Sequence, residues 1–345
     1  MRRLVVAIAI VALAGILLGA NGTEEVAFTK VGTAGLPFLK IGIGARPAGM
    51  GQAFVAVAND VSSVYWNPAG MPYVKGTGVL VNYIHWFAGI SYTYVATVTS
   101  LGGGGNLGVQ SGLLMYGSME ETTVDEPEGT GNEFSAYDMV IGISYSRFLT
   151  DKLTVGVTLK YVNEKIYDMS ADGFAFDIGT LYYTGWKSLR IGMMLANFGT
   201  DMRIEGNNLD IRLDPWEDIP GEDVVFRFKT TSFAMPLYFR MGLAYDAIDT
   251  DEMKLTTALE LMHPSDGDEK VAVGLEAKYR DMASLRLGYY LDSNKWDDMK
   301  SATEGLSLGV GVNQSMAGGN VAVDYCARDM GYLGWVHQIT LNLGF

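Results

Sequence analysis

The chain has 345 residues, a hydrophobic fraction of 48% and a formal net charge of −14. We expect no nucleic-acid partner, because nucleic-acid phosphates bind clustered lysine and arginine and not an acidic chain. The single cysteine, Cys326, excludes an internal disulfide framework. The histidines, His85, His263 and His337, lie far apart in the sequence and lack metal-ligand spacing. The sequence therefore indicates neither a metal nor another cofactor.

The first twenty residues have the pattern of a secretory signal peptide. Arg2 and Arg3 precede an apolar run over residues 4–18, and two small residues follow at positions 19–20. A membrane anchor helix is the alternative, but the run is short for a span and polar residues follow it at once. We expect residues 1–20 to be cleaved as the chain is exported.

The next segment, residues 21–78, is apolar and rich in glycine. It is too apolar for a free tail, and four glycines between residues 42 and 51 allow close backbone packing. Asn59 or Asp60 can cap a short helical turn. Asn67-Pro68 ends that turn, because proline disfavours the αR conformation in the residue before it.

From residue 79 onward, apolar and polar residues alternate with a period of two. At the C-terminus, Ile339, Leu341, Leu343 and Phe345 fall on one face of a strand, and small or polar residues fall on the other. About fourteen runs share this alternation, and bacterial outer-membrane barrels have an even number of strands. We expect strands near residues 79–87, 89–100, 105–116, 135–148, 152–166, 173–184, 188–197, 236–246, 253–262, 269–280, 284–292, 305–313, 319–329 and 335–345.

The connections between these runs support the strand count. With a periplasmic N-terminus, the long connections 117–134 and 198–235 both lie outside the cell, whereas short links such as 102–104 and 185–187 face the periplasm. Bacterial barrels have this asymmetry. The long connections are also acidic, which we interpret as solvation of exposed loops. Divalent cations that bridge to lipopolysaccharide are the alternative, although no calcium-loop spacing is present.

The face opposite the large apolar residues carries glycine, serine, threonine and charges of both signs. We expect ten charged residues to face the lumen: Lys160, Asp177, Arg190, Arg240, Glu260, Glu276, Lys278, Arg286, Asp324 and Arg328. The polar face of a soluble β-sandwich meets bulk water and rarely needs glycine. Small residues with mixed charges suit a crowded or water-filled lumen, while the apolar face meets lipid. We therefore favour an all-β, transmembrane antiparallel barrel over a sandwich.

Aromatic residues near the ends of the runs are compatible with girdles at the two membrane interfaces. These residues are Tyr92, Tyr145, Tyr161, Tyr182, Tyr245, Tyr279 and Tyr289. A wall of about fourteen strands, over residues 79–345, encloses more room than its own side chains fill. We therefore expect residues 21–78 to fold back into the lumen as a plug, with Arg46 paired to Glu260, Glu276 or Asp324.

Two stretches resemble a known family. The stretch FLKIGIGARPAGMGQAFVAVANDVSSVYWNPAGM resembles the N-terminal signature of the PorV/PorQ family, which is itself similar to the FadL-type long-chain fatty-acid porins. The C-terminal VDYCARDMGYLGWVHQITLNLGF resembles that family's final hairpin. The positions that carry the N-terminal motif are Gly42, Gly44, Arg46, Gly49, Gly51, Asn67, Pro68 and Gly70. Pro47 departs from the family pattern, which usually has a small residue there.

The resemblance implies a fourteen-stranded, FadL-like barrel in the bacterial outer membrane, with its lumen plugged by the N-terminal segment. It also implies an accessory or cargo-shuttle role in type IX secretion, with secreted proteins or secretion-system subunits as partners. FadL-like transport of hydrophobic small molecules is the alternative. No catalytic arrangement emerges from the sequence, so we expect no enzyme. The other expected partners are outer-membrane lipid, lipopolysaccharide and the barrel assembly machinery, which would read the alternating C-terminal strand that ends at Phe345.

Overall fold

The computed structural model describes residues 30–213, 224–292, 303–316 and 318–345, and the expected signal peptide lies outside them. Within the described residues, fourteen strands close into one antiparallel barrel, as predicted. The strands are β1 (Thr77–His85), β2 (Ser91–Gly102), β3 (Gly105–Glu120), β4 (Glu133–Phe148), β5 (Leu153–Ile166), β6 (Met169–Tyr183), β7 (Arg190–Gly199), β11 (Tyr238–Asp249), β12 (Met253–Pro264), β13 (Lys270–Tyr279), β14 (Ala283–Asp292), β15 (Leu306–Met316), β16 (Gly319–Asp329) and β17 (Trp335–Gly344).

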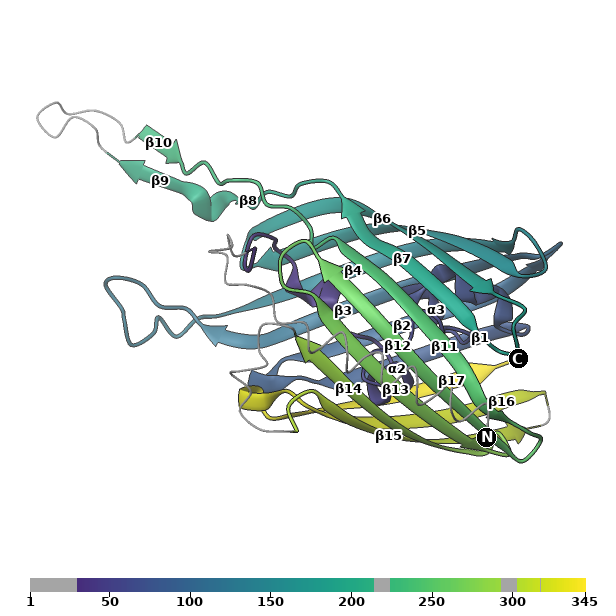
Figure 1. The fold of residues 1–345 in the computed structure, drawn as a ribbon. Coiled ribbons are helices and arrows are strands. Elements are labelled where there is room, and N and C mark those ends of the chain that lie inside the picture. Colours follow the sequence, from purple (N-terminus) through teal and green to yellow (C-terminus); the bar gives the residue numbers. More distant parts are fainter. Residues whose placement is uncertain (1–29, 214–223, 293–302, 317) are drawn as a thin grey trace, which may run out of the picture.

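Each strand begins and ends within four residues of the predicted run. Strands that follow one another along the wall are hydrogen-bonded, β7 pairs with β11, and β1 pairs with β17 to close the ring. Figure 1 shows the tilted strands of this wall, with the N-terminal helices enclosed by it. No helix among the described residues is long and apolar enough to cross a membrane.

The two faces of the wall differ as the alternation predicts. In β17, the Ile339 side chain is 53% exposed on the outer surface, whereas that of Thr340 is 1% exposed and faces the lumen. Nine of the ten charged residues expected in the lumen are buried, and the tenth, Lys278, is partly buried. The outer face of the wall is therefore the apolar surface that lipid covers.

Replacing Ile339 with arginine places a charge near the middle of the lipid-facing surface. We expect this variant to lower the free energy of unfolding by about 2–4 kcal/mol, the cost of an arginine at the bilayer midplane. The measurement is urea unfolding of the protein in lipid vesicles. The control is Val124→Arg, at a position 98% exposed in an outer loop, which we expect to change stability by less than about 0.5 kcal/mol.

The expectation that Tyr245 and Tyr92 belong to an outer girdle is wrong. Tyr245 is fully buried and stacks on Trp186 at a centroid distance of 6.2 Å. Tyr92 does not face lipid either. Its side chain is 1% exposed and lies inside the barrel, where its ring packs edge-to-face on Phe38 at a centroid distance of 6.3 Å. The inner face of β2 is itself apolar, with Tyr92, Tyr94, Ala96 and Val98 all buried. Packing against the N-terminal segment, and not contact with lipid, therefore explains the aromatic side chain at this position.

The outer connection after β7 contains structure that the sequence pattern did not predict. It holds β8 (Glu205–Gly206), η4 (Asn207–Leu209), β9 (Asp210–Leu213) and β10 (Val224–Arg227). β9 and β10 form a hairpin that projects beyond the wall in Figure 1. Its strands are four residues long and β10 is exposed throughout, so one-sided burial imposes no alternation there. Shorter 3-10 turns lie at η3 (Phe87–Gly89) and η6 (Gly331–Leu333).

The N-terminal segment crosses the interior of the barrel. Its elements are η1 (Pro37–Lys40), α2 (Ala45–Gly49), α3 (Ser63–Trp66) and η2 (Pro68–Tyr73). α2 contacts β14, β15, β16 and β17, whereas η2 contacts β3, β4, β5 and β6 on another part of the wall. The side chains of Phe54 and Trp66 are fully buried between these contacts.

Candidate functional site

Glycines on the inner face of the wall let the N-terminal segment approach closely. A Cβ atom added to Gly288 of β14 would lie 1.8 Å from the backbone nitrogen of Gly51, and one added to Gly192 would lie 2.3 Å from the carbonyl oxygen of Val55. No side chain fits at such distances. Gly51 also has a φ of +64°, which favours glycine. The small residues of the inner face are therefore contact positions for the enclosed backbone.

Arg46 of α2 lies at the centre of a buried charge network. Its Nε and Nη2 atoms donate to the two carboxylate oxygens of Glu276 on β13, each at 2.8 Å. Its Nη1 atom donates to Asn59 at 2.8 Å and to Asp60 at 2.6 Å. Burial by itself lowers the pKa of Arg46, but Glu276 and Asp60 raise that pKa above its usual value. The guanidinium therefore stays charged and holds the segment to the wall.

The network continues along the wall from Glu276. Arg286 donates from Nε to Glu276 at 2.8 Å and from Nη1 to Asp324 on β16 at 2.6 Å. Lys278 lies 3.9 Å from the same Glu276 carboxylate. Glu276 is thus the acid that pairs with Arg46, and Asp324 pairs with another arginine.

Glu260 of β12 holds a different part of the segment. One of its carboxylate oxygens accepts hydrogen bonds from the backbone N–H groups of Phe54 and Val55, at 2.7 and 2.8 Å. Arg240 donates to the other oxygen at 3.3 Å, and its guanidinium lies 4.7 Å from the centre of the Trp66 ring. Two otherwise unpaired backbone donors are satisfied in this way by a wall side chain.

Asn67 fixes the turn that ends the helical part of the segment. Its Oδ1 atom accepts from the backbone nitrogen of Ala69 at 3.1 Å. Its Nδ2 atom donates to the carbonyl oxygens of Val55 and of Thr180 on β6, at 2.9 and 3.0 Å. The Asn67 side chain is fully buried. Its single amide group therefore hydrogen-bonds to the turn at Ala69, to the segment at Val55 and to the wall at Thr180.

Changing Asn67 to aspartate removes both donors and places carboxylate oxygens beside two carbonyl groups. We expect a loss of at least about 2 kcal/mol in the free energy of unfolding, because each unsatisfied buried polar group costs about 1–3 kcal/mol. Thermal or urea unfolding in vesicles measures this change. Asn208→Asp, in an exposed outer turn, is the matched control and should leave stability unchanged.

The remaining residues of the expected N-terminal motif lie at close contacts within the lumen. The Gly42 carbonyl accepts from Gln338 at 3.2 Å, and a Cβ atom on Gly49 would lie 3.1 Å from the Cα atom of Gly309. Gly44 has a φ of +92° before α2. Pro68 packs against the inner-face Gly156, and a Cβ atom on Gly70 would lie 2.2 Å from the Ala58 carbonyl oxygen.

Two further ion pairs lie on the inner face of the wall. Lys160 pairs with Asp177 at 2.5 Å, and Arg190 pairs with Asp246 at 2.7 Å. Among the described residues, Arg328 has neither an ion-pair partner nor a hydrogen-bond partner for its buried Nε atom. The ten predicted charged residues therefore form several clusters around the lumen and do not converge on one centre.

Polar wall residues that the sequence analysis did not single out also bind the segment. Thr340 accepts a hydrogen bond from the backbone nitrogen of Ala45 at 2.7 Å, and Ser307 accepts one from that of Gly51 at 3.0 Å. The alternation places both on the inner face, so the signal was present, but small hydroxyl residues are common on that face. Within the described part of the chain, no group of three potential metal ligands gathers.

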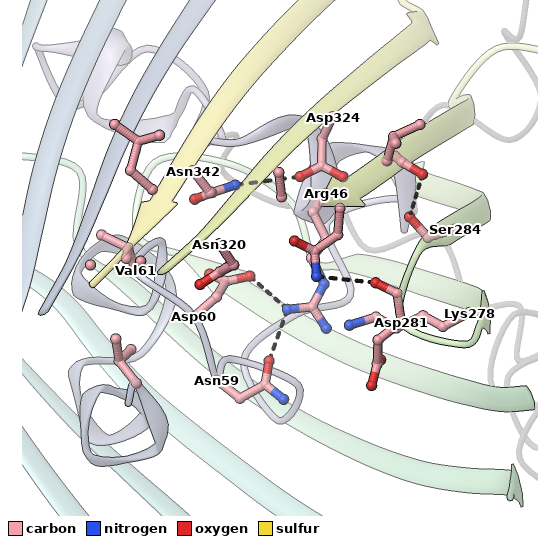
Figure 2. A pocket seen from close by; sticks show the side chains of 18 of the residues that line it. Arg46, Asn59, Asp60, Val61, Lys278, Asp281, Ser284, Asn320, Asp324 and Asn342 are labelled. Carbon is pink, nitrogen blue, oxygen red and sulfur yellow. Dashed lines mark hydrogen bonds and ion pairs between the residues drawn. The ribbon is translucent and has the colours of Figure 1, made fainter. Parts of the chain in front are cut away.

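A cavity remains between the segment and the end of the wall where the short turns lie. This cavity of about 260 Å³ is lined by Arg46, Asp60, Lys278 and Asp324, among others. Figure 2 shows Arg46 directed toward Asn59 and Asp60 beside this cavity. The lining mixes these charged residues and several asparagines with apolar side chains such as Val61, Met282 and Leu343.

The barrel with its filled lumen defines the class of protein. Solved structures with the same fold include the CymD monoaromatic hydrocarbon channel (13% identity, TM-score 0.52, covering 88% of this chain and 98% of that chain). Another is the Ralstonia pickettii toluene transporter TbuX, with 12% identity, a TM-score of 0.52 and coverage of 88% of this chain and 97% of that chain. A third is a Pseudomonas aeruginosa FadL homologue, with 12% identity, a TM-score of 0.50 and coverage of 87% of this chain and 97% of that chain. The protein is a bacterial outer-membrane β-barrel with a FadL-like fold.

The family is defined by sequence. Residues 24–264 match the family model described as type IX secretion system protein PorV. The chain therefore belongs to the PorV family, as the two resembling stretches predicted. No curated protein matches the chain.

Proposed function

We propose that this protein is a non-enzymatic, plugged barrel that serves type IX secretion at the outer membrane. The observation that carries the proposal is the PorV family match over residues 24–264. The enclosed N-terminal segment agrees with it, because buried contacts on several sides of the lumen leave the barrel unsuited to act as an open pore. In this proposal residues 21–78 are the plug, and the protein acts through its surfaces on secreted proteins or secretion-system subunits.

The proposed partners include the machinery that builds the barrel. The alternating C-terminal strand β17, with Ile339, Leu341 and Leu343 outward, is the segment that we propose this machinery recognises. Outer-membrane lipid and lipopolysaccharide would cover the apolar outer face.

Deletion of the gene tests the proposed role in secretion. In the deletion strain we expect proteins with type IX sorting domains to disappear from the cell surface, and the wild-type gene to restore them. Normal surface display in the deletion strain would refute the secretion role. A genome that encodes no such secreted proteins would also count against it.

Transport of hydrophobic molecules is the second candidate function. The observation that favours it is an irregularity in the wall: the register of the pairing between β6 and β7 shifts between Phe176 and Ile178. By contrast, β3 pairs without interruption through Ser111 and Gly112, where a kink would have favoured transport. Uptake of toluene that depends on the gene, together with normal secretion, would support this candidate instead.

A further inference from the structure

A second cavity lies between the N-terminal segment and the outer end of the wall. It measures about 280 Å³ and is lined by η1 and the residues after it, by the outer ends of β13, β14 and β16, and by η6. Three aromatic side chains, Trp86, Tyr238 and Tyr290, line it together with Ile41 and Leu291. The cavity is slightly smaller than the range of about 300–1,000 Å³ for ligand pockets, and its aromatic and aliphatic lining fits an apolar body about the size of one ring.

Arg328 brings a positive charge to this cavity. The residue is 6% exposed and lines the cavity from β16. Its Nε atom is buried without a hydrogen-bond partner, and no acid among the described residues forms an ion pair with it. A buried guanidinium without an anion is strongly unfavourable.

The other buried arginines differ from Arg328. Arg46, Arg190, Arg240 and Arg286 each pair with a carboxylate at 3.3 Å or less. In the described part of the chain, each of the buried arginines except Arg328 therefore has a carboxylate partner. The missing anion at Arg328 is a local feature of this cavity.

The other charged residues that line the cavity each interact with another residue; they are Lys40, Lys270, Asp292, Glu304 and Asp329. Lys270 pairs with Asp292 at 3.3 Å, and Lys40 pairs with Asp266 at 2.5 Å. Asp329 accepts hydrogen bonds from the Thr303 hydroxyl and from a backbone nitrogen. Arg328 is therefore the group that can accept a new anion without the loss of an existing pair.

We propose that this outer cavity binds a carboxylate joined to a small apolar or aromatic body, with Arg328 as the group that binds the carboxylate. A carboxylate matches the planar fork of a guanidinium and can accept two parallel hydrogen bonds. Trp86, Tyr238 and Tyr290 would enclose the apolar body. The ligand is either a free organic acid or the C-terminal carboxylate of a peptide with an apolar last residue. The proposal does not depend on the secretion role.

Calorimetric titration of the full mature protein in a nonionic detergent tests this site. The probes are phenylacetate, its neutral isostere phenylacetamide, and a short peptide that ends in phenylalanine with a free or an amidated C-terminus. We expect each acid to bind at least about tenfold more tightly than its amide, the effect of one charge-assisted hydrogen bond. The tighter of the two acids identifies the source of the carboxylate.

The variant Arg328→Gln should abolish the preference for acids. Arg280→Gln is the matched control, because Arg280 is exposed at the periplasmic end and pairs with Glu252. A shift in gel mobility on boiling shows that each variant is folded. Equal binding of acid and amide by the wild-type protein would overturn the proposal, whether or not the variants fold. An unchanged preference in folded Arg328→Gln would overturn it as well.

Discussion

Replacing Arg46 with methionine is expected to lower the free energy of unfolding by about 3–5 kcal/mol, the range for breaking a buried ion pair by removal of one partner. The variant loses four charge-assisted hydrogen bonds, to Glu276, Asn59 and Asp60. Glu276 would keep Arg286 and the more distant Lys278 as cations. Urea unfolding in vesicles, followed by tryptophan fluorescence, measures the loss, because Trp66 is fully buried in the same segment.

The exposed pair Arg280–Glu252 provides the matched control for Arg46→Met. Its atoms are 2.7 Å apart, but both side chains are more than half exposed. Arg280→Met should therefore cost at most about 1 kcal/mol. A double-mutant cycle with Glu276→Gln isolates the coupling between Arg46 and Glu276. Equal losses for the two arginine variants would contradict the view that the buried network holds the segment in place.

Replacing Gly288 with valine is expected to expel the N-terminal segment from its place in the lumen. The added Cβ atom would lie 1.8 Å from the Gly51 nitrogen and 2.2 Å from the Met50 carbonyl carbon, so backbone must move. Overpacking of a well-packed interior costs about 1–3 kcal/mol, occasionally more. Once displaced, the segment leaves a lumen wide enough for small solutes, and we expect single-channel conductance to rise.

Conductance in planar bilayers separates this effect from general destabilisation. Ala277→Val on the neighbouring strand β13 adds two methyl groups on the opposite face of the wall and should leave conductance unchanged. Removal of residues 21–72 should reproduce the raised conductance of Gly288→Val. If a correctly folded truncation conducts no more than the full chain, the segment is not a plug.

The wall could be predicted from the sequence because lipid and lumen impose a strict alternation on each strand. Ile339 and Thr340, which are neighbours in the chain, take opposite faces as their chemistry requires. Alternation along the sequence does not predict the structure where a segment no longer separates lipid from lumen. The β9–β10 hairpin lies beyond the wall, and Tyr92 faces an apolar interior, so neither follows from a lipid-facing pattern.

The contacts inside the lumen could be predicted only in part. Three acids were candidates for Arg46, and the choice of Glu276 depends on the stagger of strands far apart in the sequence. The same holds for Arg328, because the absence of a partner depends on every side chain around its cavity. Sequence alternation gives the face on which a residue lies, whereas its neighbours across the lumen depend on the closed barrel.

The seam between β1 and β17 has a consequence for the enclosed segment. This seam joins the first and the last strand of the wall and closes the ring. Thr340 of β17 binds both Asn82 of β1 and the backbone of Ala45 in the enclosed segment. The residue that closes the ring thus also binds the enclosed segment, so closure of the seam and anchoring of the segment share one hydroxyl group.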